Sequence, residues 1–415
     1  MYLKKDEKKG ALGLVSREKY LKEKKKGFRT IENPDIGEYE KKIKRHRMKN
    51  ILIIIGVIAV VFIIVGINIL KEKTKVYGDY DIESTLADAN AVNNNFFKYK
   101  NGIIEVSRDG ISYIEGKQTI WNYAYEIKNP IYAVCDNYIA VGDTLGTKVY
   151  IFNESGYKSE TDVYGTPTDI AVTNTGCIIV CIEENTTNYI YMYSQDTQIY
   201  KIKTDISGGG YPLAMASSED GQKLVVSYLY IDGEKMMTKV VFYNFSGVGQ
   251  NESERAVGAW HYEDTIIPKV QFTDNDTVVL LGDNMISVYD YRQIPENRYE
   301  VNIEHEIKKA FIENGYIGIV YNLTDSNNSH ELCVYSASKQ KPVLKYAYNE
   351  DYTEYMVAED YIMMYNTSAC RMINFNGSVK FDYTFKNIIN RLVKTDSHNQ
   401  FYMIADGSIR KIRLK

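Results

Sequence analysis

The sequence predicts an all-β protein, a β-propeller of seven or eight four-stranded blades with eight favoured, preceded by one transmembrane helix. Its composition, a unit recurring about every forty residues and one long uncharged apolar run support this prediction. The 415 residues include 37 Tyr and 13 Phe but only 7 Pro, and aromatic residues favour half-buried strands. Hydrophobic residues at 44% and charged residues at 25% argue against global disorder and against a polytopic membrane protein.

The uncharged run extends from Ile51 to Leu70 and reads ILIIIGVIAVVFIIVGINIL. A helix of this length spans about 30 Å, the thickness of the hydrocarbon core of a bilayer. Fifty residues precede it, and the following KEKTKVYG has no small-residue cleavage pattern, so an uncleaved signal anchor is expected. A buried helix of a soluble protein is the alternative, but such helices are rarely apolar on every face.

The charge distribution predicts which side of the membrane each part occupies. Residues 1–50 hold 17 Lys and Arg against 8 Asp and Glu, a net charge of +9, whereas residues 51–415 hold 33 against 46, a net charge of −13. Six basic residues directly precede the run: Lys41, Lys42, Lys44, Arg45, Arg47 and Lys49. The positive-inside rule therefore predicts a single-pass cell-membrane protein with a cytoplasmic N-terminus and the remainder outside. The acidic body argues against nucleic acid as a partner.

The expected domains follow from this topology. Residues 1–50 form a basic cytoplasmic tail, expected to be disordered, and residues 51–70 form the transmembrane helix. Residues 71–95, which end in an Asn run, are expected to form a stalk, and residues 96–415 the extracytoplasmic propeller. All five cysteines lie in this outer part. Cys177 and Cys181 would lie about 13 Å apart on one strand, too far for a disulfide bond.

The outer part repeats a pattern of an apolar strand, a polar turn and a more apolar second strand. An amphipathic hairpin follows each pair, which gives four strands per unit. The successive starts are Ile131, Thr168, Pro212, Pro268, Lys308, Glu354 and Ile389. Their irregular spacing near forty residues is typical of a β-propeller. A stacked array of β-sandwiches is the alternative, but a ring leaves only short exposed edges.

An eighth, less complete unit begins at Gly102 with GIIEVSRDGISYIEGKQTIWNYAYE. The last unit ends at SIRKIRLK with only three recognisable strands. The ring must therefore close by borrowing a strand from elsewhere in the chain, or accept a short last blade.

Two segments carry a resemblance to known propellers. SSEDGQKLVVSY, from Ser217 to Tyr228, is similar to the S-x-D-G-x-x-L turn of bacterial TolB-like and related propellers, and GIIEVSRDGISYIEGKQTIW resembles the units of quinoprotein-type propellers. With its basic tail, single apolar helix and the segments GGGYPLAMASSEDGQKLVVSY and VVFYNFSGVGQN, the chain resembles a bacterial family of single-pass, membrane-anchored propellers classed as a domain of unknown function. The resemblance implies topology and fold, and no catalytic residue.

Motifs that would carry chemistry are weak. Trp121 and Trp260 are too few for the usual sandwich around a quinone cofactor and are interpreted as strand aromatics. The tripeptide around His305 would alternate between the two faces of a strand and present no common ligand set. The run of oxygen-bearing residues from Asp325 to Glu331 lacks the glycine and the bidentate Glu of a calcium loop. No catalytic, cofactor-binding or metal-binding residue is therefore predicted.

The predicted function is a membrane-tethered binding or scaffold module for an envelope protein, peptide or glycan, because repeat rings present variable turns on a rigid frame. The first alternative is an envelope hydrolase, lyase or oxidoreductase with its site in the central funnel, although the sequence does not favour an enzyme. The second is a sensor that signals through the basic tail. The oligomeric state stays open.

Overall fold

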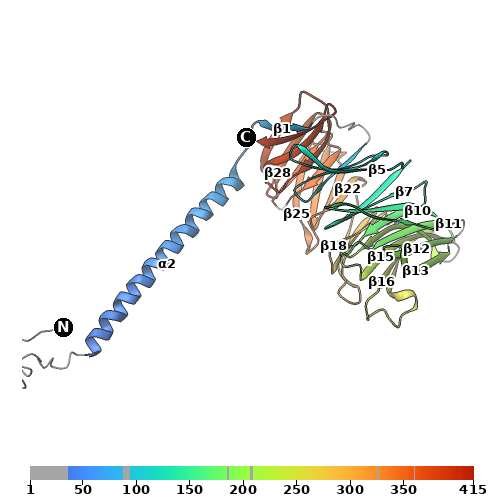
Figure 1. The fold of residues 1–415 in the computed structure, drawn as a ribbon, viewed down its shortest axis with the longest axis horizontal. Helices are drawn as coiled ribbons and strands as arrows, with labels where there is room; N and C mark the ends of the chain where they lie inside the picture. Colours follow the sequence, from blue (N-terminus) through green and yellow to red (C-terminus); the bar gives the residue numbers. More distant parts are fainter. Residues whose placement is uncertain (1–35, 87–93, 185–186, 206–208, 325–326, 359) are drawn as a thin grey trace, which may run out of the picture. The chain divides into compact units, whose positions relative to one another are not determined.

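The computed structural model describes residues 36–86, 94–184, 187–205, 209–324, 327–358 and 360–415. They form two compact units, divided between Lys75 and Val76, and Figure 1 shows the fold of each. The first described element is helix α2 (Ile36–Thr74). The helix includes the basic segment before the apolar run, which was expected to be disordered. Lys, Arg, Glu and Met are good helix formers and extend a helix that the apolar run has already nucleated. Residues 1–35 of the predicted tail lie outside the described residues.

The second unit is an all-β propeller of eight four-stranded sheets, which confirms the predicted fold and the larger blade number. Blades 1 and 2 contain β2 (Asn95–Tyr99), β3 (Gly102–Val106), β4 (Gly110–Glu115), β5 (Gln118–Ala124), β6 (Pro130–Cys135), β7 (Tyr138–Asp143), β8 (Lys148–Asn153) and β9 (Gly156–Asp162). Blades 3 and 4 contain β10 (Thr166–Val172), β11 (Ile178–Glu184), β12 (Thr187–Ser194), β13 (Thr197–Asp205), β14 (Tyr211–Ser217), β15 (Lys223–Asp232), β16 (Lys235–Asn244) and β17 (Ala256–Glu263). A short 3₁₀ helix, η1 (Ser253–Arg255), precedes β17.

Blades 5 and 6 contain β18 (Lys269–Asp274), β19 (Thr277–Leu281), β20 (Met285–Asp290), β21 (Glu296–Asn302), β22 (Ile307–Glu313), β23 (Tyr316–Asn322), β24 (His330–Ser336) and β25 (Lys339–Tyr348). Blade 7 contains β26 (Glu354–Val357), β27 (Tyr361–Tyr365), β28 (Ala369–Asn374) and β29 (Val379–Thr384), and blade 8 begins with β30 (Ile389–Lys394), β31 (Gln400–Ala405) and β32 (Ser408–Leu414). All the pairings are antiparallel. The first strands of blades 2 to 8 begin within two residues of the unit starts predicted from the sequence.

The hydrophobic core is divided among the blade interfaces. Eight clusters of buried side chains occur among the described residues, one between each pair of neighbouring blades, and one of them joins blade 8 to blade 1. The second strand of a blade serves two clusters, because successive side chains point to opposite faces of the sheet. On β11, Ile178 and Val180 pack toward blade 2, whereas Ile179 and Cys181 pack toward blade 4. This explains why the second strand of each repeat is the more apolar one.

The ring closes with a strand from the start of the propeller. β1 (Tyr80–Leu86) pairs antiparallel with β32 and completes blade 8 in the order β1-β32-β31-β30. Its carboxylates meet basic residues of the C-terminus, since Glu83 pairs with Arg413 and Asp81 lies 2.5 Å from Lys415 Nζ. The expectation that residues 71–95 form a stalk outside the propeller is therefore corrected for residues 80–86. Residues 87–93 of that segment lie outside the described residues.

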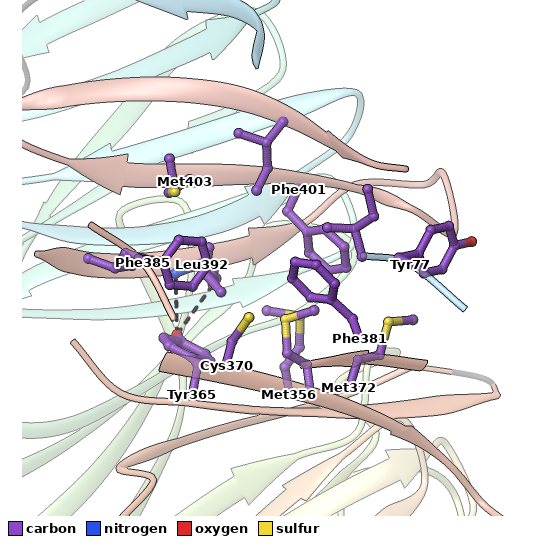
Figure 2. Close-up of a cluster of buried hydrophobic side chains, with 14 of the residues drawn as sticks. Tyr77, Met356, Tyr365, Cys370, Met372, Phe381, Phe385, Leu392, Phe401 and Met403 are labelled. Carbon is purple, nitrogen blue, oxygen red and sulfur yellow. Dashed lines mark hydrogen bonds between the residues drawn. The ribbon is translucent and has the colours of Figure 1, made fainter. Parts of the chain in front are cut away.

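Tyr77 extends this closure before β1 begins. Its side chain is only 2% exposed and belongs to the cluster between blades 7 and 8, where Figure 2 shows it beside Phe381. Its N–H donates to the carbonyl of Lys380 at 2.7 Å, and the N–H of Gly78 donates to the carbonyl of Lys415 at 2.9 Å. The chain is thus part of the propeller only three residues after helix α2 ends.

The turn that resembles TolB-like propellers joins β14 to β15. Ser218 Oγ accepts a hydrogen bond from the N–H of Lys223 at 3.0 Å and donates to Asp220 Oδ1 at 2.6 Å. Gly221 has a φ of +71°, a conformation that side chains with a Cβ rarely adopt. The S-x-D-G pattern in this chain therefore has a structural role in closing a hairpin turn.

Candidate binding site in the central channel

The first strands of the blades line the centre of the ring, because first strands of neighbouring blades contact each other, as β6 contacts β10 and β30 contacts β2. A cavity of about 290 Å³, here called the basic cavity, is lined by β2, β22, β26 and β30 together with Tyr365 of β27. A second cavity of about 410 Å³, here called the second cavity, is lined by β6, β10, β14 and β18 and by residues that follow them. Each cavity thus collects side chains from four consecutive blades.

The basic cavity gathers charges from four blades. Its charged lining residues are Lys98, Glu313, Glu354, Arg391 and Lys394. Lys309 of β22 lies beside it and donates from Nζ to Glu354 Oε1 at 3.0 Å, while Arg391 Nη1 donates to Glu354 Oε2 at 3.4 Å. Two cations from two different blades therefore share one carboxylate of a third blade.

Glu313 is held at the junction of blades 6, 7 and 8. Its Oε2 accepts the N–H of Val357 at 2.7 Å, and its Oε1 lies 3.9 Å from Lys394 Nζ. Burial raises the pKa of Glu313 above its ordinary value. The hydrogen bond from Val357 and the positive charges of Lys394, Arg391 and Lys269 lower the pKa, but by less than burial raises it. Burial also lowers the pKa of Lys269 on β18, against the attraction of Glu313. These effects place charges from blades 5, 6 and 8 within electrostatic reach of one another.

Aromatic rings flank the charged groups. Phe97 stacks on Tyr132 of blade 2 with centroids 4.9 Å apart and an interplanar angle of 12°, and Phe311 stacks on Tyr355 of blade 7 at 5.3 Å and 13°. Burial raises the pKa of Tyr132, and the charge of Arg391 opposes that shift. Arg391 of blade 8 lines the basic cavity, and its charge acts on groups in both blade 2 and blade 6.

The basic cavity adjoins a third cavity of about 540 Å³, which shares Lys98 and Lys394 with it. In this third cavity the Nδ1 atom of His398 lies 3.2 Å from Asp360 Oδ1, and the imidazole meets the ring of Tyr361 edge to face at 5.1 Å. The buried Nε2 atom of His398 has no hydrogen-bond partner among the described residues. The carboxylate thus orients the imidazole, but the remaining ring nitrogen has no access to the cavity.

The second cavity combines small and apolar side chains, such as Ala133, Val172 and Ala216, with polar and acidic ones, which are Asp136, Ser217, Glu219, Gln271 and Asp274. Asp169 of β10 lies between blades 3 and 4, where its carboxylate accepts the N–H of Ile170 at 2.9 Å and the N–H of Met215 at 3.2 Å. Burial raises the pKa of Asp169 to about 6, although both hydrogen bonds oppose the shift. Asp169 therefore links blades 3 and 4, and because burial disfavours its charged form, the folded protein is more stable when the carboxyl is protonated.

Replacing Asp169 with Asn is expected to change stability in a pH-dependent way. The carboxyl titrates near 3.8 when unperturbed and near 6 in the folded protein, so its contribution is complete below about pH 4 and is lost as the pH rises through 6. About two pKa units correspond to about 3 kcal/mol. In urea titrations, the free energy of unfolding of the variant relative to the wild type should rise by up to about 3 kcal/mol between about pH 4 and about pH 7. A constant difference over this range would contradict the prediction.

The residues considered for chemistry in the sequence lie away from the channel charges. Trp121 lies on β5 and stacks on Phe152 at 5.8 Å, and Trp260 lies on β17 and meets Phe242 at 5.2 Å, so both pack between blades. His305 lies between β21 and β22 and contacts the ring of Tyr321. Asp325 of the calcium-like run lies outside the described residues. Within the described part of the chain, no three His, Cys, Asp or Glu side chains are placed to hold a metal ion.

Solved structures with a similar fold are propellers of low sequence identity. The crystal structure of BamB from Moraxella catarrhalis aligns with a TM-score of 0.52 and 12% identity, over 81% of this chain and all of that chain. Sqt1 from Chaetomium thermophilum aligns with a TM-score of 0.51 and 9% identity, also over 81% of this chain and all of that one. At these identities the similarity shows the fold alone.

Comparison at the level of sequence places the chain in a family. No curated protein matches it. The model of a family of unknown function, DUF5711, matches residues 73–414. The match begins at the end of helix α2 and includes β1 and all eight blades, so it covers the complete ring. The chain belongs to the DUF5711 family.

Proposed function

We propose that this protein is a membrane-anchored propeller that binds a protein partner on the outer side of the cell membrane. Helix α2 supplies the anchor, with the N-terminus in the cytoplasm. The propeller supplies a rigid ring, and its turns supply the binding surface.

The observation that carries this proposal is the exposure of the apolar helix. The segment Glu40–Ile67 is long and apolar enough to cross a membrane, and none of its most apolar stretch is buried. Side chains such as Ile53 and Phe62 are 64% and 73% exposed. An apolar surface of this size in water is unfavourable by about 25 cal/mol per Å², and lipid would cover it. The six basic residues before the span support the cytoplasmic position of the N-terminus.

Crosslinking in intact cells tests the binding part of the proposal. A membrane-impermeant crosslinker, followed by purification of the full-length protein under denaturing conditions, should recover the same envelope protein reproducibly. A control chain of residues 1–75, which has the tail and helix but no propeller, should not recover that protein. Recovery of cytosolic proteins alone, or of the same protein by both chains, would overturn the proposal.

The observation that favours an enzyme instead is the pair of shifted groups near the basic cavity. Burial raises the pKa of Glu313 and lowers that of Lys269, and such pairs are common at catalytic sites. However, the carboxylate of Glu313 accepts the N–H of Val357 and lies near the ammonium group of Lys394, which is also the arrangement of an ion pair with a purely structural role. We therefore place the enzyme second to the binding module.

A further inference from the structure

The propeller is acidic overall, but five of its basic residues lie together in one part of the central channel. Residues 76–415 hold 30 Lys and Arg against 45 Asp and Glu, a net charge of −15. Yet five cations on the first strands of blades 5, 6, 8 and 1 lie in or beside the basic cavity: Lys98, Lys269, Lys309, Arg391 and Lys394. Among the described residues, the carboxylates of Glu313, Glu354 and Asp396 face them, and that of Asp360 lies in the adjoining cavity with Lys98 and Lys394. The described residues here carry five cations against four carboxylates, so this part of the channel is less acidic than the propeller as a whole.

The ion pairs between blades do not use all the donors of these cations. Arg391 makes a single hydrogen bond of 3.4 Å to Glu354, and its side chain is 46% exposed. Its other N–H groups have no partner among the described residues, and neither has the ammonium group of Lys269 beyond its electrostatic attraction to Glu313. By contrast, Lys309 donates both to Glu354 and to the carbonyl of Thr353. Arg391, which lines the basic cavity, thus has N–H groups available for a ligand.

The chemistry of these donors selects an oxyanion. A guanidinium presents paired N–H groups that match the geometry of carboxylate and phosphate. Lys394 of the same strand, whose Nζ donates to the carbonyl of Val357 at 3.1 Å, would add a second cation to the same ligand. The rings of Phe97 and Phe311 line the same cavity, and ring surfaces accommodate an apolar or aromatic group next to the anion.

We propose that the basic cavity is a binding site for a small organic anion, in which a carboxylate or phosphate group is attached to an apolar or aromatic group. Arg391 binds the oxyanion through its free N–H groups, Lys309 and Lys394 supply the surrounding positive charge, and Phe97 and Phe311 contact the apolar part. The site exists only in the closed ring, because its cations come from blades 6 and 8 and its rings from blades 1 and 6. It goes beyond the proposed binding of a protein partner and does not depend on membrane topology.

Calorimetric titration of the full-length protein in an uncharged maltoside detergent tests the site. Phenyl phosphate or benzoate should bind. Two controls, the neutral analogue benzyl alcohol and inorganic phosphate, should each bind at least about tenfold more weakly than whichever organic anion binds more tightly. Arg391→Gln should weaken binding of that ligand by about tenfold or more. Lys309→Gln is a second variant in case Arg391→Gln unfolds, and melting temperatures measured in parallel show which variants are folded.

Lys308→Gln is the matched control. Lys308 precedes Lys309 on β22 but pairs with Asp351 rather than with Glu354 of the basic cavity, so its replacement should change the affinity by less than about twofold. Equal losses in the Lys308 and Arg391 variants would show general attraction to a positive surface and would overturn the proposal. Inorganic phosphate binding as tightly as phenyl phosphate, or no binding of either organic anion to the folded wild type, would overturn it as well.

Discussion

A soluble chain that begins at residue 76 is expected to fold as a closed propeller, whereas a chain that begins at residue 95 is expected to lose most of its stability. The shorter chain lacks β1 and Tyr77, which leaves β32 with an unpaired edge and opens a cavity between blades 7 and 8. Loss of a buried aromatic side chain alone costs about 3–5 kcal/mol. Loss of a whole strand should bring the total decrease in the free energy of unfolding to more than about 5 kcal/mol, measured by urea denaturation of both chains.

Addition of the missing strand in trans provides the control. A peptide of residues 76–86 added to the shorter chain should raise its melting temperature, because it restores the pairing with β32 and the ion pairs to Arg413 and Lys415. A scrambled peptide of the same composition should have no effect. Equal stability of the two chains without any peptide would show that β1 does not close the ring.

Replacing Phe242 with Ala is expected to lower the free energy of unfolding by about 3–5 kcal/mol. Phe242 is fully buried between blades 4 and 5. Its ring centroid lies 5.0 Å from that of Tyr289 and 5.2 Å from those of Trp260 and Tyr291, so truncation to Ala removes three aromatic contacts and leaves a cavity. Urea denaturation of the purified variant measures the change.

Two further variants separate packing from side-chain chemistry. Phe242→Leu keeps much of the volume and should cost clearly less than Phe242→Ala. Ile231→Ala removes an apolar side chain that is 75% exposed, and it should change stability by no more than about 0.5 kcal/mol. A loss of less than about 1 kcal/mol in Phe242→Ala would contradict the assignment of this blade interface as core.

The repeat was predictable because both strands of each unit's first pair carry strong apolar signals. The second strands, such as β11 and β19 (Thr277–Leu281), are buried on both faces and therefore read as continuous apolar runs. β1 was missed because it is an outer strand with partners on one side only. Its sequence YDIESTL places apolar residues at Tyr80, Ile82 and Leu86, but Ile82 is 50% exposed and no residue of the strand is fully buried. The strand therefore lacks the continuous apolar run of the inner strands.

The basic cavity could not be predicted for a different reason. Lys98, Lys309 and Arg391 are separated by 211 and 82 residues in the chain, and only closure of the ring brings them together. A signal was nevertheless present: the repeat units that start near residues 268, 308 and 389 carry basic residues on their first strands, whereas those near 131, 168 and 212 carry none. Comparing the first strands of all the repeat units would have indicated that basic residues lie together on one side of the channel.

Membrane topology is the central claim of the proposed function, and cysteine labelling in intact cells tests it most directly. In a chain whose partly exposed Cys135 and Cys177 are replaced by Ser, a single cysteine is introduced either at Lys117, an exposed turn of blade 1, or at Lys44, before the apolar span. A membrane-impermeant maleimide should label Lys117→Cys in intact cells and Lys44→Cys only after permeabilisation. Labelling of Lys44→Cys in intact cells while Lys117→Cys stays protected would place the propeller in the cytoplasm and contradict the proposal.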